Sequence, residues 1–267
     1  MRFANQGRSA FLALILSMGA SAAGAQKATE CTKLEFCYCV DAAQNPVIDK
    51  NVAYFRDQIA AQRKAGRAVG YLSVPLSSIG GGVFHINSEV ASSVKAAVEK
   101  RFGADQVWLL NPSVPESNIP GGTGADYMLM WTRILEGAAG TGDIDFTYFV
   151  GPQDFARFFA LDGVGDMARL EQYFDTRAKS DAGLQKAIEK GLTRMAFRNY
   201  YAFKASTTIS RGAHDEWNIV RAINERRRAS DKFGLGDQIA TLFDGHAVSV
   251  SEFEAATSQG YAGRCTN

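Results

Sequence analysis

Hydrophobic runs and amphipathic segments alternate along most of this chain. Three runs are typical of buried strands: AVGYLSV at 68–74, QVWLL at 106–110 and DFTYFV at 145–150. Elsewhere hydrophobic residues recur at helical spacing, over 52–65, from Asn87 or Ser88 to 101, and over 126–135, 153–161 and 165–195. Strands that alternate with helices predict right-handed crossover units and therefore a mainly parallel sheet.

A fourth strand and helix are predicted toward the C-terminus. Residues 198–209 are rich in aromatic and β-branched side chains, which favours a half-buried strand, and Gly212 then marks a turn. Four residues of the following helix share one stripe: Glu216, Ile219, Val220 and Ile223. This stripe puts a carboxylate on the apolar face, whereas Asp215 lies on a more polar stripe and is expected at the surface or at the helix dipole.

The remaining C-terminal part is expected to contain a helix over 239–243, a short strand over 247–250 and a last helix from Ser251. All these elements predict one α/β domain over residues 26–267, a mainly parallel sheet flanked by helices in a Rossmann-like or flavodoxin-like three-layer arrangement. Each of the four predicted main strands stops at a turn rich in Gly, Pro or Ser. In a parallel sheet those turns gather on the carboxyl edge, so we expect a ligand site there.

The first 25 residues have the features of a secretory signal peptide. Arg2 and Arg8 precede an apolar run from 10 to 18, and small residues end at Ala25, so cleavage is expected before Gln26. We therefore expect a periplasmic or secreted protein with no membrane span after cleavage. Without those two arginines, 27 of the 29 basic residues remain against 28 acidic ones, which disfavours a nucleic-acid polymer as partner.

All four cysteines lie in the predicted mature chain: Cys31, Cys37, Cys39 and Cys265. In an oxidising compartment this even count predicts two disulfides. Cys37 and Cys39 are poorly placed to pair with each other, so we expect Cys31 to pair with one of them and Cys265 with the other, which ties the termini together. A repeated C-x-x-C is absent and only three histidines are present, so no metal site is expected.

The common catalytic motifs are also absent. The chain has no G-x-x-x-x-G-K-[ST] phosphate loop, and the glycines at 80–82 are not spaced as G-x-G-x-x-G, so no nucleotide cofactor is expected. No G-x-S-x-G elbow is present, and no histidine stands in an obvious triad order. A hydrolase of the Ser/His/Asp type is therefore disfavoured.

Two short segments resemble motifs of the nucleoside 2-deoxyribosyltransferase-like superfamily. AVGYLSVP, with Tyr71 and Pro75, is similar to a Y-[LI]-x-G-P turn after the first strand. SRGAHDE, with Ser210, Gly212 and Glu216, is similar to an S/D-x-G-[TA]-x-x-E turn that supplies a glutamate nucleophile. The resemblance implies a nucleoside or nucleotide ligand and N-glycosidic chemistry, in which Glu216 attacks the anomeric carbon and forms a covalent intermediate.

Further residues have expected roles in that chemistry. Tyr71 is expected to orient Glu216 or to bind the sugar, and Asp126, Asp145 or Asp154 to protonate the leaving base. Trp217 is expected to stack on the base. The other expected ligand contacts lie at strand ends and at the start of the last long helix: Pro75, Gly82, Asn111, Gly151, Asp154, Ser210 and Gly212.

Other interpretations fit the same sequence. A glutamate near the start of a helix also complements the helix dipole without any catalytic role. An exported, non-enzymatic α/β domain would use the same crevice to bind a small ligand or a protein. A secreted glycohydrolase that acts on an external nucleotide such as NAD is a third interpretation.

Overall fold

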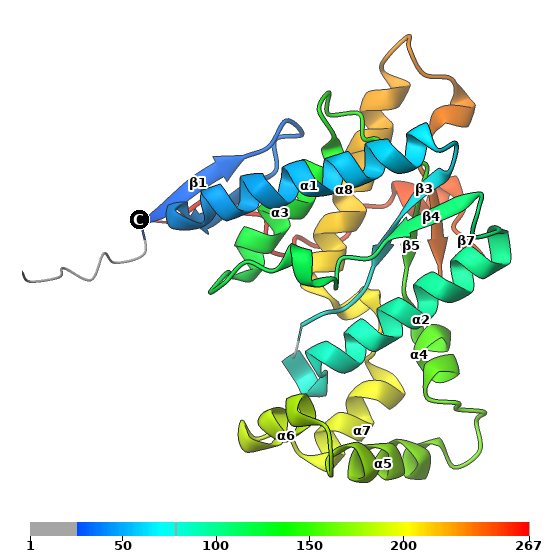
Figure 1. Cartoon of the computed structure of the whole chain (residues 1–267). Helices are drawn as coiled ribbons and strands as arrows, with labels where there is room; N and C mark the ends of the chain where they lie inside the picture. The colour runs from blue at the N-terminus through cyan, green and yellow to red at the C-terminus, as the bar shows by residue number, and fades with distance from the viewer. Residues whose placement is uncertain (1–25, 78, 267) are drawn as a thin grey trace, which may run out of the picture.

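Parallel strands occupy the centre of the molecule, as the alternation of strands and helices predicts (Figure 1). The computed structural model describes residues 26–77 and 79–266, so the predicted signal peptide of residues 1–25 lies outside the described residues. Five strands pair in the order β4-β3-β5-β6-β7, and all neighbours are parallel except the last pair. Their bounds are β3 (Ala68–Ser73), β4 (Val107–Leu110), β5 (Phe146–Phe149), β6 (Ala240–Phe243) and β7 (His246–Ala247).

Helices cover both faces of this sheet, which confirms the predicted three-layer α/β fold (Figure 1). One face carries α1 (Asn45–Lys64), α3 (Gly124–Glu136) and α8 (Arg211–Arg228). The other face carries α2 (Phe84–Phe102) and α4 (Pro152–Phe158). Three more helices extend that second layer: α5 (Asp166–Arg177), α6 (Ala182–Glu189) and α7 (Arg194–Phe203). We call residues 166–203 the α5–α7 lobe, and it lies at the bottom of Figure 1.

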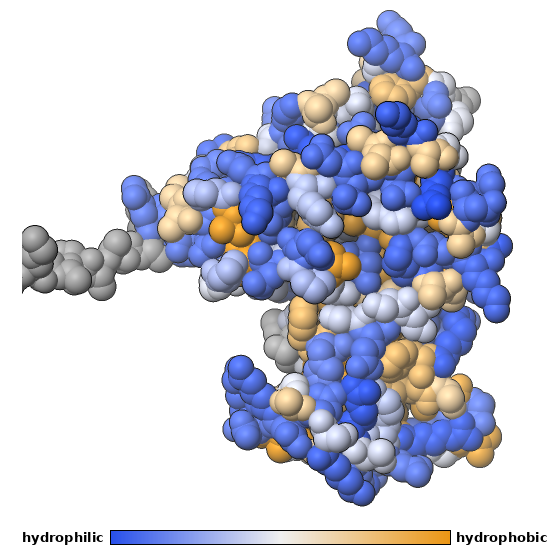
Figure 2. Space-filling model, in the orientation of Figure 1, coloured by the Kyte–Doolittle hydropathy of each residue, from blue (hydrophilic) through white to orange (hydrophobic). Residues whose placement is uncertain are grey.

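Each face of the sheet has its own hydrophobic core. Tyr71 of β3 belongs to the core under α3 and α8, where its ring centroid lies 5.7 Å from that of Trp131. Leu72 belongs to the opposite core, together with Phe155 of α4 and Tyr201 of α7. Successive side chains of a strand point to opposite faces, so β3 supplies both cores. On the face of the molecule shown in Figure 2 the surface is mainly hydrophilic, with hydrophobic residues in small patches.

The strand order reverses between β3 and β5. After β3 the chain crosses to β4 through α2 on one face, and before β6 it passes through α8 on the other face. In doubly wound sheets such a switch point places a crevice at the carboxyl ends of the two neighbouring strands. Side chains at the ends of β3 and β5 are therefore positioned for a site.

Residues 198–209 do not form the predicted fourth strand. They contain the end of α7 and a 3₁₀ turn, η4 (Thr207–Ile209). Phe197, Tyr200 and Tyr201 are buried at i, i+3 and i+4, and Phe203 is exposed, so the aromatic residues follow a helical stripe. The spacing of these aromatic residues predicts their secondary structure better than their β propensity does, because an aromatic side chain stabilises a helix or a strand alike when that element buries it.

Two other predictions near the C-terminus are wrong. Residues 239–243, expected as a helix, contain β6, and the short strand expected over 247–250 is instead β7 followed by α9 (Val250–Glu254). A strand of four residues is too short to show a clear period, and pairing with β5 decides its conformation.

The N-terminal segment before α1 contains regular structure. β1 (Lys27–Cys31) and β2 (Cys37–Asp41) form an antiparallel hairpin, and the C-terminus lies beside it (Figure 1). Disulfides join Cys31 to Cys37 and Cys39 to Cys265, in agreement with the predicted scheme. Two disulfides indicate an oxidising, extracytoplasmic environment. No helix in the described residues is long and apolar enough to span a bilayer.

Candidate functional site

Helix α8 begins near the carboxyl edge of the sheet and carries Glu216 in its second turn. Ser210 caps the helix, because its Oγ accepts a hydrogen bond from the Ala213 N–H at 3.4 Å. All four residues of the predicted stripe are buried: Glu216, Ile219, Val220 and Ile223. The helix therefore presents one carboxyl group to the sheet within an otherwise apolar surface.

The Glu216 carboxyl group meets two hydroxyl groups of β3. Tyr71 donates to one carboxyl oxygen and Ser73 to the other, each at 2.5 Å. Tyr71 and Ser73 are two positions apart on the strand, so both project toward α8. Glu216 is 6% exposed and the two hydroxyl residues are 0% exposed, so Glu216 alone in this trio keeps accessible surface. We call these three residues the Glu216 cluster.

Burial controls the protonation of this cluster. It raises the pKa of Glu216 to about 7, although the hydrogen bonds from Ser73 and Tyr71 act in the opposite direction. Burial and the charge of Glu216 together hold the pKa of Tyr71 well above its ordinary value, so Tyr71 remains a donor. A carboxyl group with a pKa near 7 is half ionised at neutral pH, which is typical of catalytic acids and bases.

The Glu216 cluster lies at the switch point of the sheet. Ser73 is the last residue of β3 and pairs with Phe149, the last residue of β5. Thr147 is paired with Tyr71 across the same two strands, and its Oγ1 lies 3.4 Å from that of Thr241 on β6. Buried hydroxyl groups therefore continue from the cluster across the sheet beneath α8.

Helix α7 and η4 cover part of the carboxyl edge. The Thr207 N–H and Oγ1 both donate to the Val150 carbonyl at 3.0 Å. Gly82, a predicted ligand contact, packs against α7 so closely that a Cβ there would lie 2.8 Å from the Tyr200 ring. The glycine loop after β3 is thus a packing surface for the α5–α7 lobe.

Two of the aspartates expected to act as proton donors are engaged elsewhere. Asp126 is fully buried and accepts hydrogen bonds from the Thr123 N–H at 2.7 Å and the Asp41 N–H at 2.9 Å. It therefore caps α3 and joins it to β2. Asp145 precedes β5 at the amino edge of the sheet, where it accepts from the Val69 N–H at 2.7 Å. The sequence itself indicates this place, because Asp145 is the first residue of a predicted parallel strand and so lies at the edge opposite the strand ends.

The third aspartate, Asp154, lies across the sheet from the Glu216 cluster. It accepts hydrogen bonds from the Gly151 N–H at 3.0 Å and from the Tyr148 hydroxyl at 2.9 Å at the start of α4. Tyr148 belongs to the core opposite the one that contains Tyr71. Burial raises the pKa of Asp154, but the sheet separates its carboxyl group from Glu216.

Other predicted ligand contacts occur at strand ends but bond to α2 or within their own loops. The Pro75 carbonyl accepts a hydrogen bond from Asn87 Nδ2 at 2.6 Å. Asn111 follows β4, and its side chain accepts from the Ser113 N–H at 3.0 Å. Gly212 lies in the first turn of α8. These residues shape the carboxyl edge rather than extending the Glu216 cluster.

Trp217 packs between the sheet and the C-terminal segment. Its ring centroid lies 5.1 Å from that of Phe149 and 4.7 Å from that of Phe253. Its Nε1 donates to the Ala255 carbonyl at 3.0 Å. These contacts are those of a structural tryptophan and occupy the ring expected to stack on a base.

Asp215 is 0% exposed, so the expectation that it lies at the surface is wrong. Its carboxylate accepts backbone N–H groups of the C-terminal segment, from Gly260 at 2.8 Å, Tyr261 at 2.7 Å and Ala262 at 3.1 Å. The polar residue on this helical stripe binds backbone N–H groups rather than water. Periodicity alone cannot distinguish a polar residue that faces solvent from one that binds buried backbone.

Sequence reasoning missed Ser73, although its position carried a signal. A polar residue two places after Tyr71 in a buried strand requires a hydrogen-bonding partner on the same face. Among the described residues, one group of side chains could hold a metal ion, namely His85, Glu89 and Asp181, and it lies between α2 and α6, outside the Glu216 cluster.

Comparison with protein-family models, curated proteins and solved structures finds no match to this chain.

Proposed function

We propose that this protein is a periplasmic or secreted enzyme that cleaves or transfers the N-glycosidic bond of a nucleoside or nucleotide, with Glu216 as the nucleophile. One observation carries the proposal: a buried carboxyl group with a pKa of about 7 is held by two hydroxyl donors at the switch point of a parallel sheet. The motif resemblance supports the same glutamate. The two disulfides support export.

In this reaction ionised Glu216 attacks the anomeric carbon, and the bond from that carbon to the base nitrogen breaks. The base leaves with the bonding electron pair and takes a proton from water, since the three aspartates are engaged elsewhere. Water or an acceptor then attacks the glycosyl ester and releases the Glu216 carboxylate. The hydroxyl groups of Tyr71 and Ser73 orient the carboxylate and stabilise its charge whenever it is ionised.

The test measures free base by chromatography after the chain from residue 26 is incubated with nucleosides, nucleotides and NAD. We expect release by the wild type and a loss of at least about 1000-fold in Glu216→Gln, because the amide cannot form the ester. Glu225→Gln is the matched control, since Glu225 lies on the same helix with its side chain 54% exposed, and it should leave the rate unchanged. Thermal melting checks that each variant folds.

Two results would contradict the proposal. If no substrate yields more free base than a buffer blank, the proposed glycosidic activity is contradicted. Equal release by wild type and Glu216→Gln would keep the activity but remove Glu216 as its nucleophile.

The packing of the carboxyl edge favours a second candidate, a non-enzymatic ligand-binding domain. Thr207 and Gly82 join α7 and η4 to the loops after β5 and β3, so these elements cover part of the carboxyl edge. A thermal-shift screen separates the two functions. Stabilisation by a nucleoside without base release would support the binding domain.

A further inference from the structure

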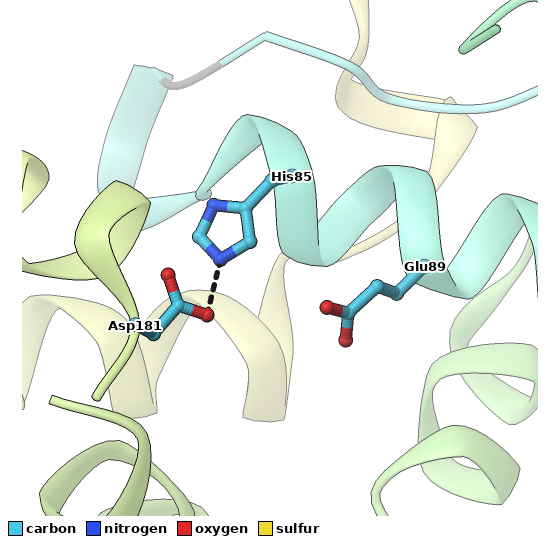
Figure 3. A group of neighbouring side chains, drawn as sticks. All are labelled: His85, Glu89 and Asp181. Atoms are coloured by element: carbon cyan, nitrogen blue, oxygen red, sulfur yellow. Dashed lines mark hydrogen bonds and ion pairs between the residues drawn. The ribbon is translucent and has the colours of Figure 1, made fainter. Parts of the chain in front are cut away.

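A second cluster of chemically active side chains joins the α5–α7 lobe to the body of the molecule. His85 and Glu89 lie one turn apart on α2, at i and i+4, so they share one face of that helix. Asp181 caps the start of α6 and faces them (Figure 3). The Asp181 carboxylate accepts from the Leu184 N–H at 2.9 Å through one oxygen, and its other oxygen is directed at α2.

The potential ligand atoms of these three residues converge. The His85 Nε2 lies 2.7 Å from Asp181 Oδ2, and one nitrogen or oxygen atom from each of His85, Glu89 and Asp181 lies within 4.8 Å of the others. Gly183 permits this approach, because a Cβ there would lie 2.6 Å from the His85 ring. The imidazole is thus seated against the backbone of α6 with Nε2 directed at the carboxylate.

Arg177 shows that both carboxylates are directed at one cationic position. A single guanidinium nitrogen donates to Glu89 Oε1 and to Asp181 Oδ2, each at 2.6 Å. The Arg177 side chain is 32% exposed, and its guanidinium carbon lies 5.7 Å from the centroid of the Tyr173 ring. Two carboxylate oxygens therefore converge on a point that a positive charge already occupies, and the His85 Nε2 lies beside one of these oxygens.

We propose that His85, Glu89 and Asp181 bind a divalent transition-metal ion, of which zinc is the best match, at the position of the Arg177 guanidinium. One imidazole and two carboxylates form a three-ligand set, and the exposed side of the cluster leaves room for water as the fourth ligand. The imidazole favours zinc-type ions over magnesium and calcium, which prefer oxygen ligands.

Binding requires only a local rearrangement. Ligand atoms around a tetrahedral zinc ion lie about 3.3–3.6 Å apart at metal-to-ligand distances of roughly 2.0–2.2 Å. His85 Nε2 and Asp181 Oδ2, which are 2.7 Å apart, must therefore separate slightly, and Glu89 must adjust to complete the set. Glu89 is the residue that can move, because its side chain is 41% exposed, whereas Asp181 is 11% exposed and fixed as a helix cap. The ion would cross-link α2 to α6 and thereby hold the α5–α7 lobe on the sheet.

The test is titration of zinc chloride into the EDTA-treated chain from residue 26, followed by calorimetry and by the shift in melting temperature. We expect one zinc site in the wild type and an affinity at least about tenfold weaker in His85→Ala and in Glu89→Gln. Arg177→Gln should bind zinc more tightly than the wild type, since the competing cation is gone. His214→Ala is the matched control, because the His214 ring bonds to Ser258 and to the Thr208 carbonyl, outside this cluster.

Three outcomes would overturn the site. The first is no zinc binding by the wild type. The second is an affinity that is the same in wild type and Glu89→Gln, a variant at a half-exposed position that should fold normally. The third is an unchanged affinity in Arg177→Gln, which would remove the ion from the guanidinium position. Because none of these variants touches Glu216, the test is independent of the proposed activity.

Discussion

Two carboxyl groups in this protein, those of Glu216 and Asp181, have opposite surroundings. Glu216 is buried between α8 and β3, and its partners are two neutral hydroxyl groups. Asp181 lies between α2 and α6, and its partners include the guanidinium of Arg177 and the ring of His85. Burial raises the pKa of Glu216 to about 7, whereas for Asp181 the hydrogen bonds outweigh burial and lower the pKa to about 2.

The difference shows that surroundings, rather than residue type, decide what a carboxyl group can do. Neutral donors in a buried site leave Glu216 at the point of ionisation near neutral pH, which suits chemistry. Hydrogen bonds from the Leu184 N–H, His85 and Arg177 hold the pKa of Asp181 low and keep it ionised throughout the physiological range, which suits the binding of a cation. Three predictions test this contrast.

The largest expected effect is a pH-dependent loss of stability caused by Glu216. Below pH 4.5, its ordinary pKa, Glu216 is protonated in both the folded and the unfolded state. Between pH 4.5 and about 7 it is ionised in the unfolded chain but still protonated in the folded protein. Stability therefore falls as pH rises through this window, by about 3 kcal/mol in total, and stays level above it. Urea unfolding of wild type and Glu216→Gln at pH 5 and pH 8 measures it.

The glutamine variant is its own control, because every other titrating group is common to both proteins. The difference in free energy of unfolding between the two proteins should shift in favour of Glu216→Gln at pH 8. A difference that is the same at both pH values would mean that Glu216 does not titrate in this range.

A smaller effect is expected when one hydroxyl donor is removed. Ser73→Ala deletes a hydrogen bond that stabilises the ionised form, so the pKa of Glu216 should rise above about 7. The variant should lose about 1.5–3 kcal/mol at pH 8 and less at pH 5, and the midpoint of its pH–activity profile should move upward. Ser92→Ala, at an exposed position on α2, is the control; an unmoved midpoint in Ser73→Ala would contradict the assignment.

The smallest effect is expected at the half-exposed cluster. Arg177→Gln removes charged hydrogen bonds to Glu89 and Asp181, yet partly exposed pairs contribute no more than about 1 kcal/mol. Salt should reduce this loss further, whereas the Glu216 effects should not change, because buried groups are screened little. Urea unfolding at low and high sodium chloride measures the effects of Arg177→Gln and of the Glu216 substitution. A larger loss of stability in Arg177→Gln that does not depend on salt would contradict the difference between the two sites.

The sequence by itself determined the layers of the fold and the position of the main carboxylate. Three hydrophobic runs predicted β3, β4 and β5, and helical spacing placed Glu216 on the buried stripe of α8. The cysteine count and placement predicted the two disulfides and left open only whether Cys31 pairs with Cys37 or with Cys39. These features follow from the spacing of hydrophobic residues and from the local composition, both of which can be read directly from neighbouring positions in the sequence.

Tertiary structure decided the features that depend on what covers a surface. Residues 198–209 became helix and turn because their aromatic side chains pack on the lobe, and 240–243 became a strand because β5 pairs with it. Asp215 is buried because the C-terminal segment passes over it. Ser73 and Asp181 acquired their partners from segments more than 90 residues away, at separations of 143 and 96. Such contacts arise only when distant elements are folded together, so no local pattern encodes them.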